Sequence, residues 1–390
     1  MARAPLRSAG LSVTLALALA ASGSAAAEDD ERVSARAEVG IEYDDNVHHV
    51  EQIPTIDAVP VGSALTRAVV GWSASDRLSA NQDVAFSVRG GMKLFAASAA
   101  RSENVAIVDT SGAWRIAPNP RTRLGLSATY YEAIQAGTFT ERAVSLDARD
   151  FRSITPTLRA LRALSDWGTL GMTVGYRSFV YKPARNYDFQ APVIGIEHRF
   201  TRETSDGEAD WDLMSAVGVE LRRFAGVRLV QPAGGCTLEP CQVADPSQAR
   251  HADQFFTGQL DVTRTGSVLV GAGYALQWNR SNSYAESLIR HVGSVRFTAP
   301  LPLGLYLAAR AELVYATYPQ KVAIAVGGPS GQVSASIEEE TRSQVRAEVS
   351  RDLTGGLQFV ARYSFYANAL GQGQYRRQTG MLSLVYTLGD

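Results

Sequence analysis

Seven basic side chains are the residues of this sequence best suited to act on a solute, because each lies in a segment where every second residue is apolar. Val84, Phe86 and Val88, for example, alternate with polar residues that include Arg89. Charges of one sign on a pore wall raise the local concentration of the opposite ion, so such a set would favour anions. The predicted lumen-lining set is Arg89, Lys93, Arg177, Arg222, Arg310, Arg346 and Arg362.

Acidic residues share the polar positions with these cations, and basic groups outnumber them by roughly two to one. Glu220 and Glu312 are examples in the bodies of two segments. The sequence therefore fits two interpretations equally. The first is an anion-favouring lumen, and the second is a polar interior filled by paired ions. Pairing between segments decides which of them holds.

The two cysteines are Cys236 and Cys241, in the run Cys-Thr-Leu-Glu-Pro-Cys. In an oxidising compartment this spacing can close a small loop through a disulfide, which we expect here. A metal site is the competing interpretation, and it is disfavoured because no further ligands lie near the two thiols.

The histidines predict no catalytic centre, no metal site and no cofactor. His251 lies near Asp253 in a long loop, but no serine hydrolase motif surrounds it, and His291 falls among apolar positions. Asp44, Asp45 and Asn46 could begin a calcium site, although a solvated turn is the preferred interpretation. We expect the protein not to be an enzyme.

The alternation itself indicates the elements that position these residues. Successive side chains of a β-strand point to opposite faces, and many such segments of 10 to 13 residues describe a transmembrane β-barrel. Val84, Phe86, Val88, Met172, Val174, Leu382 and Leu384 are predicted to face lipid. About 16 antiparallel strands are expected, with 14 to 18 possible, at 35–43, 64–73, 83–95, 104–116, 122–132, 152–164, 169–181, 191–200, 213–224, 254–264, 267–279, 288–299, 304–318, 341–351, 356–368 and 378–388.

The links between these segments alternate in length. Short turns such as 74–77, 264–266 and 354–356 follow the even-numbered strands, and long links such as 44–63, 133–151, 225–253 and 319–340 follow the odd-numbered ones. Short periplasmic turns and longer external loops are typical of outer-membrane barrels. Aromatic residues near the strand ends, including Trp72, Trp278 and Tyr181, predict girdles at both membrane interfaces.

The first 27 residues have the layout of a secretory signal peptide, with Arg3 and Arg7, an apolar run over 11–20 and an Ala-x-Ala site before Glu28. Residues 28–390 then form one barrel domain in the outer membrane of a bacterium. The chain is 45% hydrophobic with a net charge of −1, so nucleic acid is not an expected partner. Membrane lipid and the outer-membrane assembly machinery are expected partners.

The run Glu42-Tyr43-Asp44-Asp45-Asn46-Val47 resembles the first strand of outer-membrane β-barrel porin families, including barrels found with exopolysaccharide synthesis and export systems. The resemblance implies a porin-like or polysaccharide-export pore. The predicted function is therefore a channel for an anionic solute or a polysaccharide. The alternative is a closed structural, surface or assembly barrel without transport, and an outer-membrane enzyme is the least favoured alternative.

Overall fold

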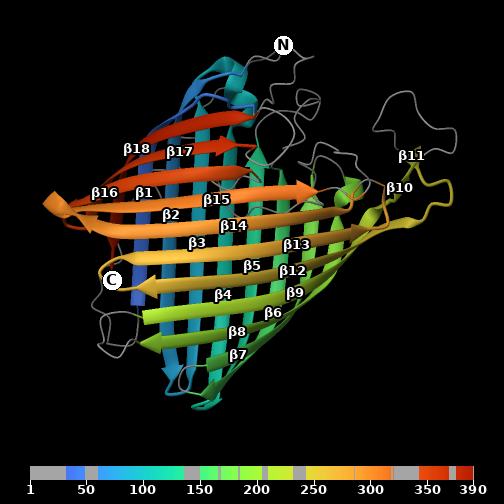
Figure 1. The fold of residues 1–390 in the computed structure, drawn as a ribbon, viewed down its shortest axis with the longest axis horizontal. Coiled ribbons are helices and arrows are strands. Elements are labelled where there is room, and N and C mark those ends of the chain that lie inside the picture. The colour runs from blue at the N-terminus through green and yellow to red at the C-terminus, as the bar shows by residue number, and fades with distance from the viewer. Residues whose placement is uncertain are drawn as a thin grey trace.

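The fold is a single closed β-barrel, seen in a computed structural model that describes residues 32–48, 60–135, 150–165, 168–182, 185–203, 210–231, 243–284, 286–317, 319, 342–368 and 375–389. Figure 1 shows its strands lying side by side in chain order. The barrel strands are β1 (Arg32–Asp44), β2 (Ser63–Ser79), β3 (Gln82–Phe95), β4 (Val105–Asn119), β5 (Thr122–Gln135), β6 (Phe151–Ser165), β7 (Gly168–Tyr181), β8 (Phe189–Glu203), β9 (Asp210–Val227), β12 (Arg250–Thr265), β13 (Leu269–Ser281), β14 (Leu288–Leu301), β15 (Leu305–Thr317), β16 (Ser343–Thr354), β17 (Leu357–Ala367) and β18 (Arg376–Leu388).

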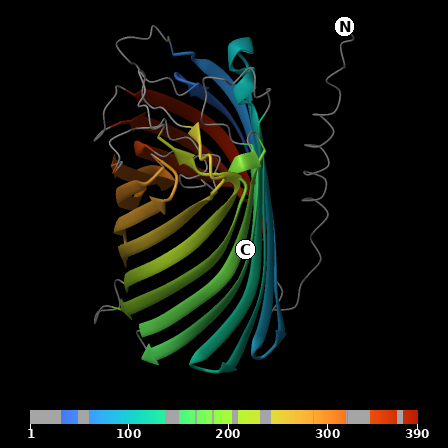
Figure 2. The same cartoon turned by 90° about the vertical axis from the view of Figure 1, so that its right-hand side faces the viewer.

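Every neighbouring pair is antiparallel, and β1 pairs with both β2 and β18, which closes the barrel. Figure 2 shows the strong tilt of the strands along the wall. The 16 strands predicted from alternation are all present, so the expected fold class is confirmed. No helix among the described residues is long and apolar enough to cross a membrane.

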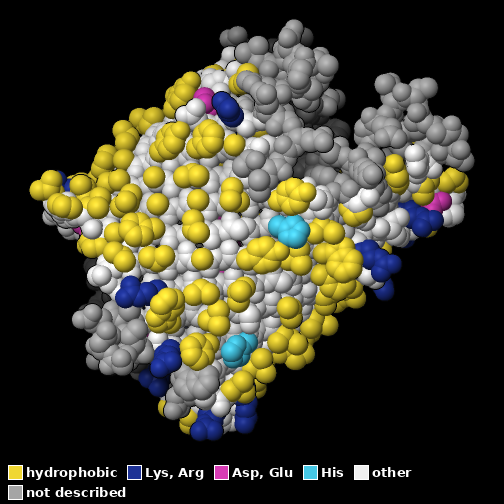
Figure 3. All heavy atoms as spheres, viewed as in Figure 1, with side chains coloured by type: hydrophobic (Ala, Val, Ile, Leu, Met, Phe, Trp, Pro, Cys, Tyr) yellow, Lys and Arg dark blue, Asp and Glu magenta, His cyan; other side chains and the backbone are white. Residues whose placement is uncertain are grey.

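Alternation places apolar side chains on the outside of the barrel. Phe86, Met172 and Val174 are 44%, 50% and 43% exposed, although all three lie in the bodies of strands. Figure 3 shows a broad hydrophobic surface over the strands, with Lys and Arg mainly at its edges. Exposed apolar surface of this extent needs lipid around it, because water would disfavour it. The chain is therefore a barrel of the bacterial outer membrane.

The connections confirm the predicted asymmetry in length. Residues 80–81, 120–121 and 355–356 are short turns at one end, whereas 228–249 and 318–342 are long links at the other. Gly355 and Gly356 both have positive φ, as their tight turn requires. One expected turn is wrong. Residues 74–77 belong to β2, because the β2–β3 hairpin continues to the pair Ser79↔Gln82 before it turns.

The long link after β9 contains a small extra sheet that alternation did not predict. Strands β10 (Leu229–Val230) and β11 (Val243–Ala244) form a two-stranded sheet separate from the barrel. Short 3₁₀ helices η1 (Ser98–Glu103) and η2 (Arg185–Tyr187) lie in two other long links, and η3 (Pro302–Gly304) forms a short turn. By the sidedness of outer-membrane barrels, the end with the long links faces the cell exterior.

Two of the three aromatic residues named for the girdles face lipid, and the third does not. Trp72 and Trp278 are 41% and 43% exposed, so their rings face lipid. Tyr181 does not, because it is 8% exposed and its ring packs edge-on against Tyr187 of η2, with 6.2 Å between centroids. Its odd number in β7 gives it the parity of Phe179, which faces inward.

Candidate functional site

The seven predicted lumen residues all lie on the inner face of the barrel wall, because each alternates with outward apolar neighbours. Their exposure divides them into three groups, with Arg89 and Arg310 exposed, Arg177, Arg346 and Arg362 half-buried, and Lys93 and Arg222 buried. Exposed side chains on an inner wall require accessible space inside the barrel. The inner face therefore combines an accessible part with a tightly packed part.

The packed part runs along β18, β1 and β2. Glu38 is 6% exposed and lies 3.6 Å from Arg67, while Glu42 accepts a hydrogen bond of 3.3 Å from Lys93 on β3. Val360 and Val385 on β17 and β18 are each 2% exposed. Ions buried this deeply need partners. Ion pairs between strands therefore stabilise this wall and leave little unpaired charge on it.

The Glu42-Tyr43-Asp44-Asp45-Asn46-Val47 run closes the barrel. Asp44 is fully buried and accepts two charge-assisted hydrogen bonds from Arg377, of 3.0 Å at Nε and 2.6 Å at Nη2. Asp45 Oδ1 accepts from the backbone N–H of Gln378, and Asn46 Nδ2 donates to the carbonyl of Arg376. The run thus ties the end of β1 to the start of β18.

This geometry corrects the interpretation of Asp44 as part of a solvated turn. Its carboxylate is occupied by a guanidinium, and it also accepts the N–H of Asn46 at 3.0 Å. Among the described residues, no cluster of His, Cys, Asp and Glu is arranged to hold a metal ion. The motif that carries the family resemblance therefore has a structural role at the seam between the first and last strands.

The accessible part of the inner wall carries a row of three arginines. The register pairs Arg296 of β14 directly with Arg310 of β15, and Arg310 directly with Arg346 of β16. Neighbouring strands are about 4.8 Å apart, so the three Cα atoms lie within about 10 Å along the hydrogen-bonding direction. We call these residues the arginine row. Like charges directly opposite each other destabilise a sheet, so the row is not explained by folding alone.

The partners of Arg310 and Arg296 in the arginine row differ in charge. Glu312, two residues from Arg310 on the same face, forms an ion pair with it and accepts from Gln344. Arg296 donates to the hydroxyl of Thr263, which is neutral. Its side chain and that of Arg310 are exposed to the interior. The row therefore presents several guanidiniums toward the accessible interior.

A second basic group lies nearer the outer end of the barrel. Glu220 is 5% exposed and is shared by two cations, Arg177 at 3.0 Å and Arg222 at 3.2 Å. The Arg222 guanidinium also lies over the ring of Phe255, 4.1 Å from its centroid, and 5.1 Å from that of Phe189. Asp253 of β12 is paired in register directly with Arg222, so two carboxylates lie beside the two guanidiniums, and the aromatic faces add cation–π stabilisation.

Arg222 adjoins a continuous row of aromatic rings across the inner face of six strands. Successive centroids are 5.3 Å apart at the first two contacts, then 4.9 Å, 5.2 Å and 3.9 Å. Three of these contacts are stacked and two are tilted, and the rings are 2% to 9% exposed, so their faces are not available to a solute. The row is Tyr131, Phe151, Phe179, Phe189, Phe224 and His251.

His251 ends this row and corrects the expectation that it lies in a loop. It belongs to β12, is 3% exposed and contacts Asp253 Oδ1 at 2.8 Å and Ser281 Oγ at 3.1 Å, both through Nε2. A hydrolase base uses its two nitrogens for two different partners. Because both contacts here involve one nitrogen, the Ser–His–Asp relay is not formed by this cluster.

Glu286, in the link between β13 and β14, completes the His251 cluster. Its Oε2 lies 3.3 Å from His251 Nε2. Burial raises the pKa of Glu286, His251 opposes the rise and Asp253 adds to it, and the resulting pKa is about 7. The carboxyl is therefore poised to change charge near neutral pH at the outer end of the barrel.

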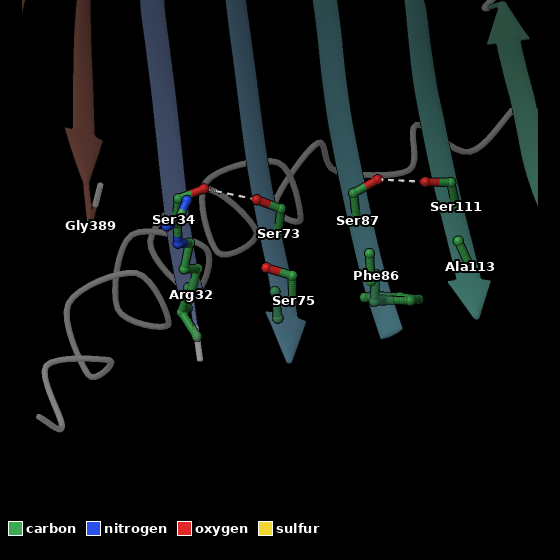
Figure 4. Close-up of a pocket in the computed structure, with 12 residues that line it drawn as sticks. Arg32, Ser34, Ser73, Ser75, Phe86, Ser87, Ser111, Ala113 and Gly389 are labelled. Atoms are coloured by element: carbon green, nitrogen blue, oxygen red, sulfur yellow. Dashed lines mark hydrogen bonds between the residues drawn. The ribbon is translucent and has the colours of Figure 1, made fainter. Parts of the chain in front are cut away.

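The opposite end of the barrel carries a row of four serine hydroxyls on its inner surface. A cavity of about 420 Å³ lies beside the first four strands, and Figure 4 shows residues that line it. Ser34 and Ser73 share a hydrogen bond of 2.7 Å, as do Ser87 and Ser111, and the register places the four side by side. The hydroxyls therefore satisfy each other in pairs, and Arg32 is a charged residue of the cavity lining.

The predictions for the cysteines, the signal peptide and His291 concern residues away from the inner wall. Cys236 and Cys241 lie outside the described residues, as does the signal peptide at 1–27, so the disulfide and the cleavage site stay predictions. The β10–β11 sheet does bring together the two ends of the segment that contains the cysteines. His291 faces outward as parity indicated, and its Nδ1 lies 2.7 Å from the hydroxyl of Tyr274.

Sequence reasoning missed the arginine row and the aromatic row as assemblies. Arg296, Arg310 and Arg346 have the correct parity in their own segments, but their alignment depends on the register of three strands. Phe189 pairs with Phe179 on one side and Phe224 on the other, again through register alone. The signal that could have revealed them is the short turn of each hairpin, which fixes register.

Comparison with known proteins gives fold-level similarity only. No protein-family model matches the chain, and no curated protein matches it. Among solved structures, OccAB1 of Acinetobacter baumannii has 10% identity and a TM-score of 0.47, covering 92% of this chain and 97% of that one. OpdK of Pseudomonas aeruginosa, solved with vanillate, has 9% identity and a TM-score of 0.46, covering 93% and 99%. Outer-membrane OmpT of Vibrio cholerae has 11% identity and a TM-score of 0.45, covering 93% and 99%.

Proposed function

We propose that this barrel is an outer-membrane channel whose interior favours anionic solutes. The observation that supports the proposal is the arginine row, Arg296, Arg310 and Arg346, aligned across three adjacent strands of the accessible inner wall. Aligned like charges disfavour the empty barrel and attract a counter-ion from solution. A 16-stranded barrel is wide enough to leave an aqueous channel, unlike one of eight strands.

Arg177 and Arg222 place two further guanidiniums near the outer end of the barrel. Guanidinium groups bind carboxylate and phosphate oxygens through paired N–H donors. The proposed cargo is therefore a carboxylated or phosphorylated solute, and an acidic polysaccharide is the large member of that class.

A salt-gradient measurement in planar bilayers tests the proposal. The wild type should conduct, with a reversal potential that shows anion preference. A triple variant should move the reversal potential toward cation preference. It combines Arg296→Gln, Arg310→Gln and Arg346→Gln. The difference should shrink in 1 M salt, where the screening length falls to about 3 Å. Arg264→Gln is the matched control, because Arg264 is exposed on the outer face and should leave selectivity unchanged.

The choice of residues keeps the test interpretable. Removal of Arg362 would leave Glu348 without its hydrogen-bonded cation, and removal of Arg222 would take one of two cations from the buried Glu220, so either change could unfold the barrel. The exposed members of the arginine row do not carry that risk to the same degree. Absence of wild-type conductance would favour the closed structural barrel. Conductance with cation preference would show that Glu312 and its neighbours neutralise the row, and the proposal would be wrong.

A further inference from the structure

Three arginines project outward from the outer end of β9, β12 and β13, away from the interior used by the proposed channel. Arg223, Arg250 and Arg280 are exposed, and each is flanked in its strand by buried residues of the opposite face, such as Arg222 and Asn279. They are called the rim arginines. Figure 3 shows basic side chains at the right-hand edge of the hydrophobic surface, by the ends of these strands.

The rim arginines lie just beyond an aromatic layer. Phe256 and Trp278 are directly paired between β12 and β13, and their rings stack at 5.2 Å. Arg280 is two residues further toward the outer end than Trp278 on the same face. Aromatic rings mark the level of the lipid headgroups, and basic side chains next to them reach the phosphate layer. The rim arginines are therefore at headgroup height in the outer leaflet.

Their charge is not used inside the protein. Arg223 and Arg280 form no ion pair or hydrogen bond with any described residue, whereas the inward Arg222 and Arg177 are paired with Glu220. Arg250 donates to the carbonyl of Ala225, which fixes its side chain beside β9. The outward positions of β9, β12 and β13 within the described strands include no Asp or Glu. An unopposed positive patch remains at the headgroup level.

The spacing suits a headgroup with more than one phosphate. Arg223 is opposite Ala252, and Arg280 is opposite Gln254, two residues further along the intervening β12. Two strand spacings and a two-residue offset place the Cα atoms of Arg223 and Arg280 about 12 Å apart. Each guanidinium can reach inward over part of that distance. Three cations spread over this width exceed what one phosphate can neutralise.

We propose that the rim arginines bind a phosphate-bearing glycolipid headgroup in the outer leaflet, with the acyl chains packed on the apolar surface below Trp278. The partner chemistry follows from the three unopposed guanidiniums, the headgroup position and the adjoining lipid-facing strands. This site is independent of ion selectivity in the barrel interior. Its occupant stays bound to the outside wall while solutes pass through the lumen.

Binding to diphosphorylated lipid A, measured with detergent-purified full-length protein by native mass spectrometry, tests the site. Arg223→Gln, Arg250→Gln and Arg280→Gln together should weaken binding by about tenfold or more, because charge-assisted hydrogen bonds are lost. The matched control is Arg202→Gln with Arg264→Gln. These two arginines are exposed on the outer face at the opposite end, both paired in register with Trp211. The control should bind as the wild type does.

The comparison lipids identify the occupant. Dephosphorylated lipid A should bind the wild type weakly, and inorganic phosphate should not displace the phosphorylated lipid at equal concentration. Three results would each overturn the proposal. They are unchanged binding by the triple variant, an equal loss of binding in the triple variant and the control variant, and tight binding of the dephosphorylated lipid. The β-sheet signal in the circular dichroism spectrum verifies that each variant is folded. Bilayer conductance of the triple variant should match the wild type, which separates this result from the proposed channel function.

Discussion

The buried pair of Asp44 and Arg377 shows how one residue contact can close a barrel. Two hydrogen bonds join the carboxylate and the guanidinium across the seam between β1 and β18, and Asp44 has no exposed surface. A buried ion with its partner removed is far less stable than the intact pair. The importance of the contact for stability therefore lies mainly in the unpaired buried charge that its loss would create.

Asp44→Ala is expected to lower the free energy of unfolding by about 3–5 kcal/mol, because the Arg377 charge would stay buried without its carboxylate. Urea unfolding in lipid vesicles, followed by tryptophan fluorescence, measures the change. The double variant Asp44→Leu with Arg377→Met is the control, and it should recover much of the loss. If Asp44→Ala is as stable as the wild type, the seam does not depend on this pair.

Glu286 predicts a pH dependence at the outer end. Its pKa of about 7 in the folded protein is above its ordinary value of 4.5, so the folded state binds the proton more tightly than the unfolded state. The resulting stabilisation is complete below pH 4.5 and is lost as pH rises through 7. The difference between the two pKa values corresponds to about 3 kcal/mol.

Replacement Glu286→Gln removes the titrating group and should flatten the fall in stability between about pH 4.5 and 7. The measurement is a series of urea unfolding curves at fixed ionic strength across this range. His251 and Asp253 also face Glu286, so His251→Gln serves as the second variant, which keeps a hydrogen-bonding side chain. An unchanged slope in Glu286→Gln would assign the pH dependence to other groups.

At the scale of strands, glycine positions reveal where the wall is tightest. A Cβ at Gly40 of β1 would lie 2.7 Å from both the Leu382 carbonyl oxygen and the Ser383 Cβ of β18. A Cβ at Gly380, on the same pair of strands, would meet no atom within 4 Å. The two positions therefore separate a packing effect at the closing seam from the general effect of replacing glycine.

Gly40→Ala should destabilise the barrel by about 1–3 kcal/mol, because the added methyl group forces the two strands apart. Gly380→Ala should be neutral or slightly stabilising, because it reduces the freedom of the unfolded chain. Unfolding midpoints of the two variants, measured side by side in vesicles, test this difference. Equal effects would show that the β1–β18 seam yields without strain.

At the scale of the whole molecule, the two faces of one strand should respond in opposite ways to the same charge. Val174 faces lipid and is 43% exposed, whereas Thr173 faces the interior. Val174→Arg places a cation in the hydrocarbon layer and should cost about 2–4 kcal/mol. Thr173→Arg should cost much less, because its side chain meets the wet interior.

Vesicle unfolding titrations of Val174→Arg and Thr173→Arg measure this contrast directly. Spin labels at Phe86 and Ser87 provide a second reading, since position 86 should report lipid and position 87 should report water. Equal environments at these neighbouring positions would be incompatible with the inside–outside assignment on which the barrel interpretation depends.

Alternation in the sequence determined the fold class and the number of barrel strands. This works because the two-residue period of a strand is local, and because lipid outside and water inside impose opposite chemistry on its two faces. Met172 and Arg177 could be assigned to opposite faces from β7 alone. The turn residues also predicted which end carries the short connections.

Only the tertiary structure decided which side chains meet. Asp44 reaches Arg377 across 333 positions of sequence, and Arg296, Arg310 and Arg346 align only when three strands take one register. A shift of two residues in any strand would preserve every alternation and still separate these groups. The sequence gives the charge of each side chain. Whether that charge is neutralised or adds to others depends on the residues of the neighbouring strand, which only the closed barrel specifies.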